Sequence, residues 1–300
     1  MADYRKPALT YEAQLDRLLD RGMKVENRED ALMALASISY YRLSAYWYPF
    51  RVRDSSGRVA SKIQAGTKFE EVLQLYEYDR QLRLLVLNAI ERIEVAVRTQ
   101  ITYYMSHEYG AFAHVDSRNF HPKFNHAGWL SRLESEAQQS SDQFIRHYRD
   151  KYEGFPTVPV WMITEIMSLG SLSRFYRGLA NSDKRAVAQH FNIHHRRLQG
   201  WLHVLTYVRN ICAHHSRLWN RELAIRPERV KEPEWRPPIT PNNNRIFYVL
   251  LILRYLMRIG GNGGEWVVDA NLLLERMTDQ PRYQEAMGLP EDWRGHPLWI

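Results

Sequence analysis

Three residues close together in the sequence carry side chains suited to phosphodiester chemistry: Arg209, Asn210 and His214. An arginine guanidinium binds two phosphate oxygens at once, and a histidine imidazole exchanges protons near neutral pH. Asn210 precedes His214 by four residues, so on a helix its amide is placed to hydrogen-bond the imidazole and fix its tautomer. An arginine and a histidine at this spacing also occur by chance, and the alternative that His214 is a surface or interface histidine stays open on the residues alone.

The stretch that must position these side chains, residues 201–221, has the period of an amphipathic helix. At about 100° per residue, counted from Arg209, a polar arc covers roughly 20° to 140°. The opposite side is apolar and wide enough to pack against neighbouring helices. The polar arc holds Asn220, Ala213, Thr206, Arg217, Asn210, Arg221 and His214, and the apolar side holds Leu218, Ile211, Val204, Val208, Trp201, Trp219, Cys212 and Leu205.

The same geometry separates two adjacent histidines. His214 falls on the polar arc, whereas His215 points at about 240°, into the apolar side. We therefore expect His215 to be a buried, hydrogen-bonded packing residue. Ala213 lies between Arg209 and Arg217 on the polar face, and its small side chain leaves room for a phosphate to reach both guanidinium groups.

Composition agrees with a globular protein that binds a polyanion. The 300 residues are 45% hydrophobic, and 41 basic against 34 acidic residues give a net charge of +7 and a pI of about 9.4. A single cysteine, Cys212, excludes an intramolecular disulfide framework and a cysteine-based zinc cluster. The first residues lack the apolar run of a signal peptide, and residues 246–257 are too short to span a bilayer, so we expect a cytoplasmic protein.

Helical periods dominate the rest of the chain and predict an all-α protein. One short β-hairpin is expected at residues 50–61, turning at residues 54–57. A long helix, or two end to end, is expected over residues 68–105, and we expect an N-terminal helical subdomain at residues 1–66 followed by one helical domain at residues 67–300. Shorter helices are expected at residues 11–21, 29–41, 129–152, from Pro159 onward, 182–190 with a Ser182-Asp183 cap, 244–259 and 266–277, with a proline-rich loop at residues 227–241 and an irregular tail.

Several segments together resemble one known family. They are the motif Arg209-Asn210-x-Cys212-Ala213-His214-His215-x-Arg217-Leu218-Trp219-Asn220-Arg221, the element Tyr40-Tyr41-Arg42-Leu43-Ser44, the segment from Pro159 through Trp161 and Glu165 to Gly170, the residues Glu91, Glu94 and Arg98, and Met287-Gly288-Leu289-Pro290. This pattern resembles the Abi-like family, the AbiD/AbiF type of abortive-infection protein, which belongs to the HEPN superfamily. The resemblance implies a HEPN-like helical bundle in which Arg209, Asn210 and His214 form the R-x4-H motif.

The resemblance also implies an activity. We expect a metal-independent endoribonuclease, without a cofactor, that acts in antiphage abortive infection or as an RNA-regulated toxin. Its products would end in a 2′,3′-cyclic phosphate and a 5′-OH. One motif supplies one histidine, so we expect a homodimer, or a dimer that forms on RNA, that joins two motifs. The alternative is a non-catalytic RNA-binding protein that holds a small structured noncoding RNA.

Other residues are candidates for binding RNA or supporting the motif. Glu94 and Arg98, four residues apart, are expected to form a surface or interhelix ion pair. Trp161 is expected to pack, and Glu165 to bond a neighbour, with a supporting role near the arginines as the alternative. The candidate RNA-binding residues are Arg217, Asn220 and Arg221 beside the motif, Lys184, Arg196 and Arg197 in a basic shoulder before it, and Arg42 among the N-terminal aromatic residues, most of which are expected to be core.

Overall fold

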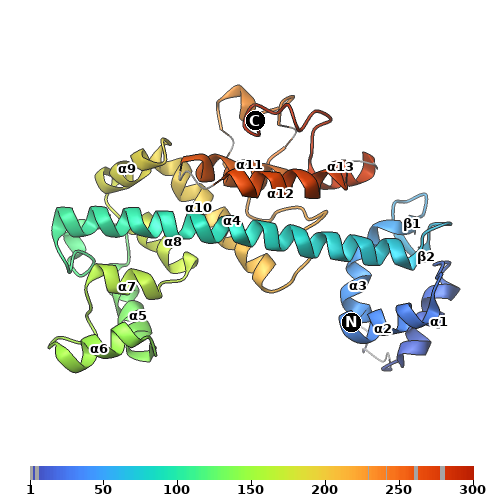
Figure 1. The fold of residues 1–300 in the computed structure, drawn as a ribbon, viewed down its shortest axis with the longest axis horizontal. Helices are drawn as coiled ribbons and strands as arrows, with labels where there is room; N and C mark the ends of the chain where they lie inside the picture. The colour runs from blue at the N-terminus through green and yellow to red at the C-terminus, as the bar shows by residue number, and fades with distance from the viewer. Residues whose placement is uncertain (1–2, 4–6, 229, 241, 260–262, 278–280) are drawn as a thin grey trace. The chain divides into compact units, whose positions relative to one another are not determined.

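In a computed structural model the chain is all-α with one short antiparallel hairpin, as the sequence predicts (Figure 1). The structure describes residue 3 and residues 7–228, 230–240, 242–259, 263–277 and 281–300. The chain folds into two compact units, residues 1–82 and residues 83–300, and each is described by itself. The domain boundary expected after residue 66 stays a prediction.

The first unit consists of short helices, the hairpin and the beginning of a long helix. In chain order its elements are α1 (Tyr11–Asp20), α2 (Arg28–Ile38), α3 (Tyr40–Trp47), η1 (Tyr48–Phe50), β1 (Arg51–Arg53), β2 (Val59–Ile63) and the start of α4 (Phe69–Tyr109). Helix α4 continues into the second unit as one uninterrupted helix of 41 residues. This is the first of the two forms that the sequence predicted for residues 68–105.

Local polar side chains set the boundaries of these elements. The side chain of Thr10 accepts a hydrogen bond at the start of α1, and Asn27 does the same for α2. The helix expected over residues 29–41 is broken at Ser39, which has φ 78° and caps α3 through its hydroxyl. The hairpin turn is where the sequence places it, because Asp54 accepts bonds from the backbone N–H groups of Ser56 and Arg58.

The aromatic segment of the first unit is divided between core and surface. Tyr46, Trp47 and Phe50 are buried, as expected for most of these aromatic residues, whereas the Tyr41 side chain is 88% exposed. The Tyr46 hydroxyl donates to the buried carboxylate of Asp79 at 2.6 Å, which satisfies both polar groups inside the core.

The second unit is built from the remainder of α4 and the helices that follow it. These are η2 (Ser117–Asn119), α5 (His126–Gln139), α6 (Gln143–Lys151), α7 (Val160–Ile166), α8 (Leu169–Gly178), α9 (Asn181–His190), α10 (His195–Ala213), η3 (Pro233–Trp235), α11 (Ile246–Ile259), α12 (Gly264–Glu275) and α13 (Pro281–Met287). Helix α10 packs against α8 and α9 (Figure 1), and α11 is almost entirely buried.

The structure corrects several predictions for the second unit. The helix expected over residues 129–152 is two helices, because Ser140 and Asp142 bond each other and interrupt the backbone ladder. Asp183 is not a helix cap; it is buried within α9, where it accepts hydrogen bonds from the hydroxyls of Tyr104 and Tyr109. The tail expected to be irregular contains α13.

In the part of the chain that the structure describes, no helix is both long enough and apolar enough to cross a membrane.

Candidate functional site

The carboxyl end of α10 forms a helix stop that the periodicity did not reveal. The helix ends at Ala213, and His214 follows as the cap residue. The N–H of His215 donates to the Cys212 carbonyl, and the N–H of Ser216 donates to the Ile211 carbonyl, both at 3.0 Å. With φ 55° at His215, these two bonds make a Schellman motif. The prediction of one helix through residue 221 is therefore wrong.

This stop changes the position of His215. Its backbone adopts the left-handed conformation, and its side chain is exposed rather than buried in the apolar face, so the packing role predicted for it is wrong. The buried members of the apolar face are correctly predicted up to Cys212. Leu218 and Trp219 are also buried, at 0% and 2% exposure, but they reach the core from a loop instead of a helix.

The three motif residues lie at the end of α10, on its solvent side. Asn210 and His214 are exposed and Arg209 is partly exposed. Arg209 Nη1 donates to Asn210 Oδ1 at 3.1 Å, so the asparagine side chain contacts the arginine instead of the histidine. Asn210 and His214 are joined only through the backbone: the N–H of His214 donates to the carbonyl of Asn210 at 3.0 Å. The imidazole of His214 therefore remains accessible to a ligand.

A cluster of charged residues from two other helices accompanies this end of α10. Arg98 on α4 pairs with Glu94 at 2.8 Å, donates to the carbonyl of Met167 at 3.0 Å and lies 3.7 Å from a Glu165 carboxylate oxygen. Burial raises the pKa of Glu94, while the charges of Arg98 and Arg209 act in the opposite direction. Arg209 is thus close enough to Glu94 to influence its charge.

The sequence had singled out the members of this cluster. The Glu94–Arg98 pair is confirmed, and through Met167 it links α4 to the end of α7. The expectation that Trp161 packs is wrong, because this side chain is 47% exposed. Periodicity could not show that Glu165 faces Arg98, since the two residues come from separate helices.

The residues beside the motif leave the helix and fold into a loop. Arg221 Nε donates to the carbonyl of Arg217 at 2.6 Å. Asn220, with φ 50°, accepts a hydrogen bond from Arg245 at 3.2 Å. These residues stay close to the motif in sequence, but the loop, not the polar arc of a helix, determines where their side chains lie.

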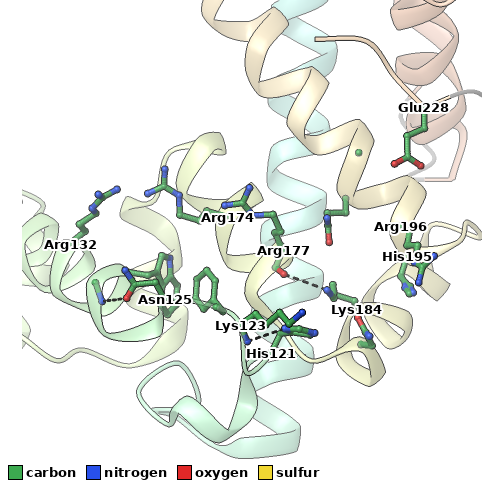
Figure 2. A pocket seen from close by; sticks show the side chains of 16 residues that line it. His121, Lys123, Asn125, Arg132, Arg174, Arg177, Lys184, His195, Arg196 and Glu228 are labelled. Carbon is green, nitrogen blue, oxygen red and sulfur yellow. Dashed lines mark hydrogen bonds between the residues drawn. The ribbon is translucent and has the colours of Figure 1, made fainter.

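The other candidate RNA-binding residues separate into different environments. Arg197 is paired with Glu232 at 2.6 Å. Lys184 and Arg196 instead line a pocket of about 860 Å³ formed by α5, α8, α9, α10 and the loop before α5 (Figure 2). Arg42 belongs to the first unit, on α3. Within the predicted basic shoulder, Lys184 and Arg196 therefore line the pocket, whereas Arg197 is paired with a carboxylate.

Comparison with known proteins identifies one relationship. A family model described as Abi-like protein matches residues 33–220, which include the motif, Glu94, Arg98 and Glu165. Neither the curated proteins nor the solved structures give a match.

Proposed function

Because the chain belongs to the Abi-like family, we propose that it acts in abortive infection as a metal-independent endoribonuclease of the HEPN type. The observation that carries this proposal is the end of α10. There a partly exposed guanidinium and an exposed imidazole lie on one short segment, beside the stop that ends the helix. A segment whose purpose was only to pack would not need Arg209, Asn210 and His214 on its solvent side.

The chemistry assigned to these residues uses a nucleophile that RNA supplies. The 2′-OH attacks the adjacent phosphate, the bond to the 5′-oxygen breaks, and a 2′,3′-cyclic phosphate and a 5′-OH remain. His214 takes or gives a proton in this reaction, and Arg209 stabilises the negative charge of the pentacoordinate phosphorus. Asn210 holds the Arg209 guanidinium through its side-chain oxygen. Arg217, Asn220 and Arg221 bind the flanking phosphates.

The alternative function is RNA binding without cleavage. The pocket lined by Lys184 and Arg196 supports it, because this basic surface lies at the other end of α10 from the motif. In this account the protein holds a small structured noncoding RNA. The two functions are compatible if the bound RNA covers the motif.

Substitution of the motif separates these functions. In purified protein, Arg209→Ala and His214→Ala are expected to abolish RNA cleavage while the circular dichroism spectrum and the Tm stay close to those of the parent. His203→Ala, which removes an exposed histidine from the same helix, is the matched control and should cleave normally. Cleavage should persist in EDTA, and mass spectrometry should find cyclic phosphate ends.

Two results would count against the nuclease. Cleavage by both motif variants at the parental rate would remove Arg209 and His214 from the chemistry. A parent protein that binds RNA tightly and leaves it intact would favour the RNA-binding alternative.

A further inference from the structure

The pocket near the amino end of α10 concentrates positive charge from separate elements. Its lining includes six basic side chains and one acidic side chain, Glu228. Figure 2 shows Arg132 on one side, Lys184 and Arg196 on the other, and Arg174 and Arg177 between them. The six basic residues are Lys123 before α5, Arg132 on α5, Arg174 and Arg177 on α8, Lys184 on α9 and Arg196 on α10.

These cations are not neutralised within the described residues. None of the six has a carboxylate within ion-pairing distance there, in contrast to Arg197, which has Glu232. Lys184 is 7% exposed, and among the described residues its ammonium group donates only to the carbonyl of Arg177, at 3.4 Å. Burial lowers the pKa of Lys184, and the charge of Arg196 lowers it further. Because a buried, unpaired charge is costly, an anion in this pocket would stabilise the folded chain.

Backbone dipoles add to the attraction for an anion. The pocket is lined by the N-cap residue of α5, Asn125, by the first residue of α9, Asn181, and by the first two residues of α10, His195 and Arg196. Helix amino termini carry partial positive charge and free N–H groups. The amino terminus of α9 has no side-chain cap, so its N–H groups are available to a ligand.

One buried polar atom also lacks a partner at this pocket. His195 is 6% exposed, and its Nδ1 makes no hydrogen bond within the described part of the chain. Buried polar atoms are almost always hydrogen-bonded, so this nitrogen is available to a ligand that enters the pocket.

We propose that this pocket is a binding site for a polyphosphate group, carried by a free nucleoside triphosphate or by the 5′-triphosphate end of an RNA. Its volume of about 860 Å³ is within the range of small-molecule sites. Cations that converge from several helices around one pocket fit a compact group with several negative charges, such as the triphosphate of a nucleotide or of an RNA end. The site is separate from the motif, because residues 196 and 209 are about 20 Å apart along α10.

Binding measurements on the intact chain test the proposal. Calorimetry with inorganic tripolyphosphate, ATP and AMP examines the free-nucleotide source. Fluorescence anisotropy with one short RNA, methylated at its 2′-OH groups so that it cannot be cleaved and carrying either a 5′-triphosphate or a 5′-OH, examines the RNA source. At least one triphosphate ligand should bind about tenfold more tightly than its counterpart with fewer phosphates, because each added charge-assisted hydrogen bond contributes on this scale.

Matched variants locate the binding. Arg174→Gln and Arg177→Gln remove exposed guanidinium groups from the pocket, and each should weaken triphosphate binding about tenfold. Arg146→Gln, an exposed arginine on α6 that does not line the pocket, should leave binding unchanged. Circular dichroism verifies that each variant is folded.

The ligands divide the outcomes. A gain for ATP and tripolyphosphate without a gain for the RNA end assigns the pocket to a free nucleotide, and the reverse assigns it to an RNA terminus. The proposal is overturned if no triphosphate binds better than its counterpart, or if the Arg174 and Arg177 variants bind like the Arg146 control. These outcomes do not depend on RNA cleavage, so the proposed nuclease activity is tested separately.

Discussion

At the scale of single residues, backbone conformation gives two adjacent histidines different roles. His214 is the cap of α10 and keeps an exposed imidazole, while His215 occupies the left-handed position that ends the helix. Histidine enters this conformation more readily than most residues, although glycine enters it at the lowest cost. His215 therefore explains why α10 stops where the motif is presented.

A pair of substitutions tests this role of His215. The free energy of unfolding of His215→Gly should exceed that of His215→Ala by about 1 kcal/mol, because the β-carbon of alanine is sterically strained at positive φ and glycine has none. Both variants remove the same imidazole, so the difference in their Tm reports the backbone alone. Equal stability, or a more stable alanine variant, would contradict the Schellman stop.

The raised pKa of Glu94 gives a second prediction at this scale. A folded-state pKa above 4.5 means that the folded chain holds this proton more tightly than the unfolded chain. The stabilisation is complete below about pH 4.5 and is lost as pH rises through the raised value. Glu94→Gln has no carboxyl group to ionise, so it does not lose stability in this way. The difference in Tm between this variant and the parent should therefore increase in favour of the variant from pH 4 to pH 7.

The exposed neighbour Glu91 supplies the comparison for this titration. Glu91→Gln removes an exposed carboxylate from the same helix. A pH dependence seen for Glu94→Gln but not for Glu91→Gln therefore comes from the burial of Glu94 and not from the loss of one negative charge. If the Tm of Glu94→Gln instead falls below the parent as pH rises, Arg98 and Arg209 stabilise the carboxylate more than burial destabilises it.

At the scale of elements, serine residues determine where several helices begin or end. Ser39 caps α3, Ser140 interrupts the segment between α5 and α6, and Ser168 caps α8. A serine hydroxyl bonds nearby backbone groups and competes with the helical ladder. These breaks divide long amphipathic segments into shorter helices. Ser168 begins α8 directly after Met167, whose carbonyl accepts a hydrogen bond from Arg98.

Arg98 is the residue that links these elements, and its removal should be destabilising. Arg98→Met breaks the pair with Glu94 and the bond to the carbonyl of Met167. Because the two side chains are only 14% and 17% exposed, we expect a loss of about 2 kcal/mol, seen as a lower Tm. Arg80→Met, which breaks an exposed pair with Glu77 on the same helix, is the control and should leave the Tm unchanged. Equal effects of the two substitutions would mean that Arg98 does not link α4 to α7.

At the scale of the whole molecule, we propose that the protein acts as a homodimer that joins two copies of the motif. Cleavage is helped by one proton-transfer group at the 2′-OH and another at the leaving 5′-oxygen. Each chain supplies one His214, so a two-fold assembly is the economical source of the second group. Arg209, Arg217 and Arg221 from two chains would repel one another, and RNA would relieve that repulsion.

Mixing two inactive variants tests the shared site. Arg209→Ala and His214→Ala subunits, each inactive alone, should recover part of the cleavage activity when combined, because one of the two composite sites then contains both intact residues. The association should strengthen when RNA is added, and RNA binding should weaken at high salt. A protein that light scattering shows to be monomeric while it cleaves RNA would exclude the shared site.

The sequence by itself determined the features that depend on neighbours along the chain. The all-α class, the hairpin turn at Asp54, the buried face of α10 through Cys212 and the spacing of Arg209 and His214 are local, because helical period and turn chemistry act over a few residues. The resemblance to the Abi-like family also came from short motifs, and the match over residues 33–220 confirms it.

Tertiary structure alone decided how distant residues meet. The helical period alone predicts that α10 extends to Arg221. In the structure the helix ends at Ala213, and the following loop brings Leu218 and Trp219 into the core. The pocket brings together basic side chains that lie between residues 123 and 196 of the sequence and belong to no common helical period or motif. Their proximity follows from packing between helices, since a contact across the core depends on where several helices end, and no single segment of sequence contains that information.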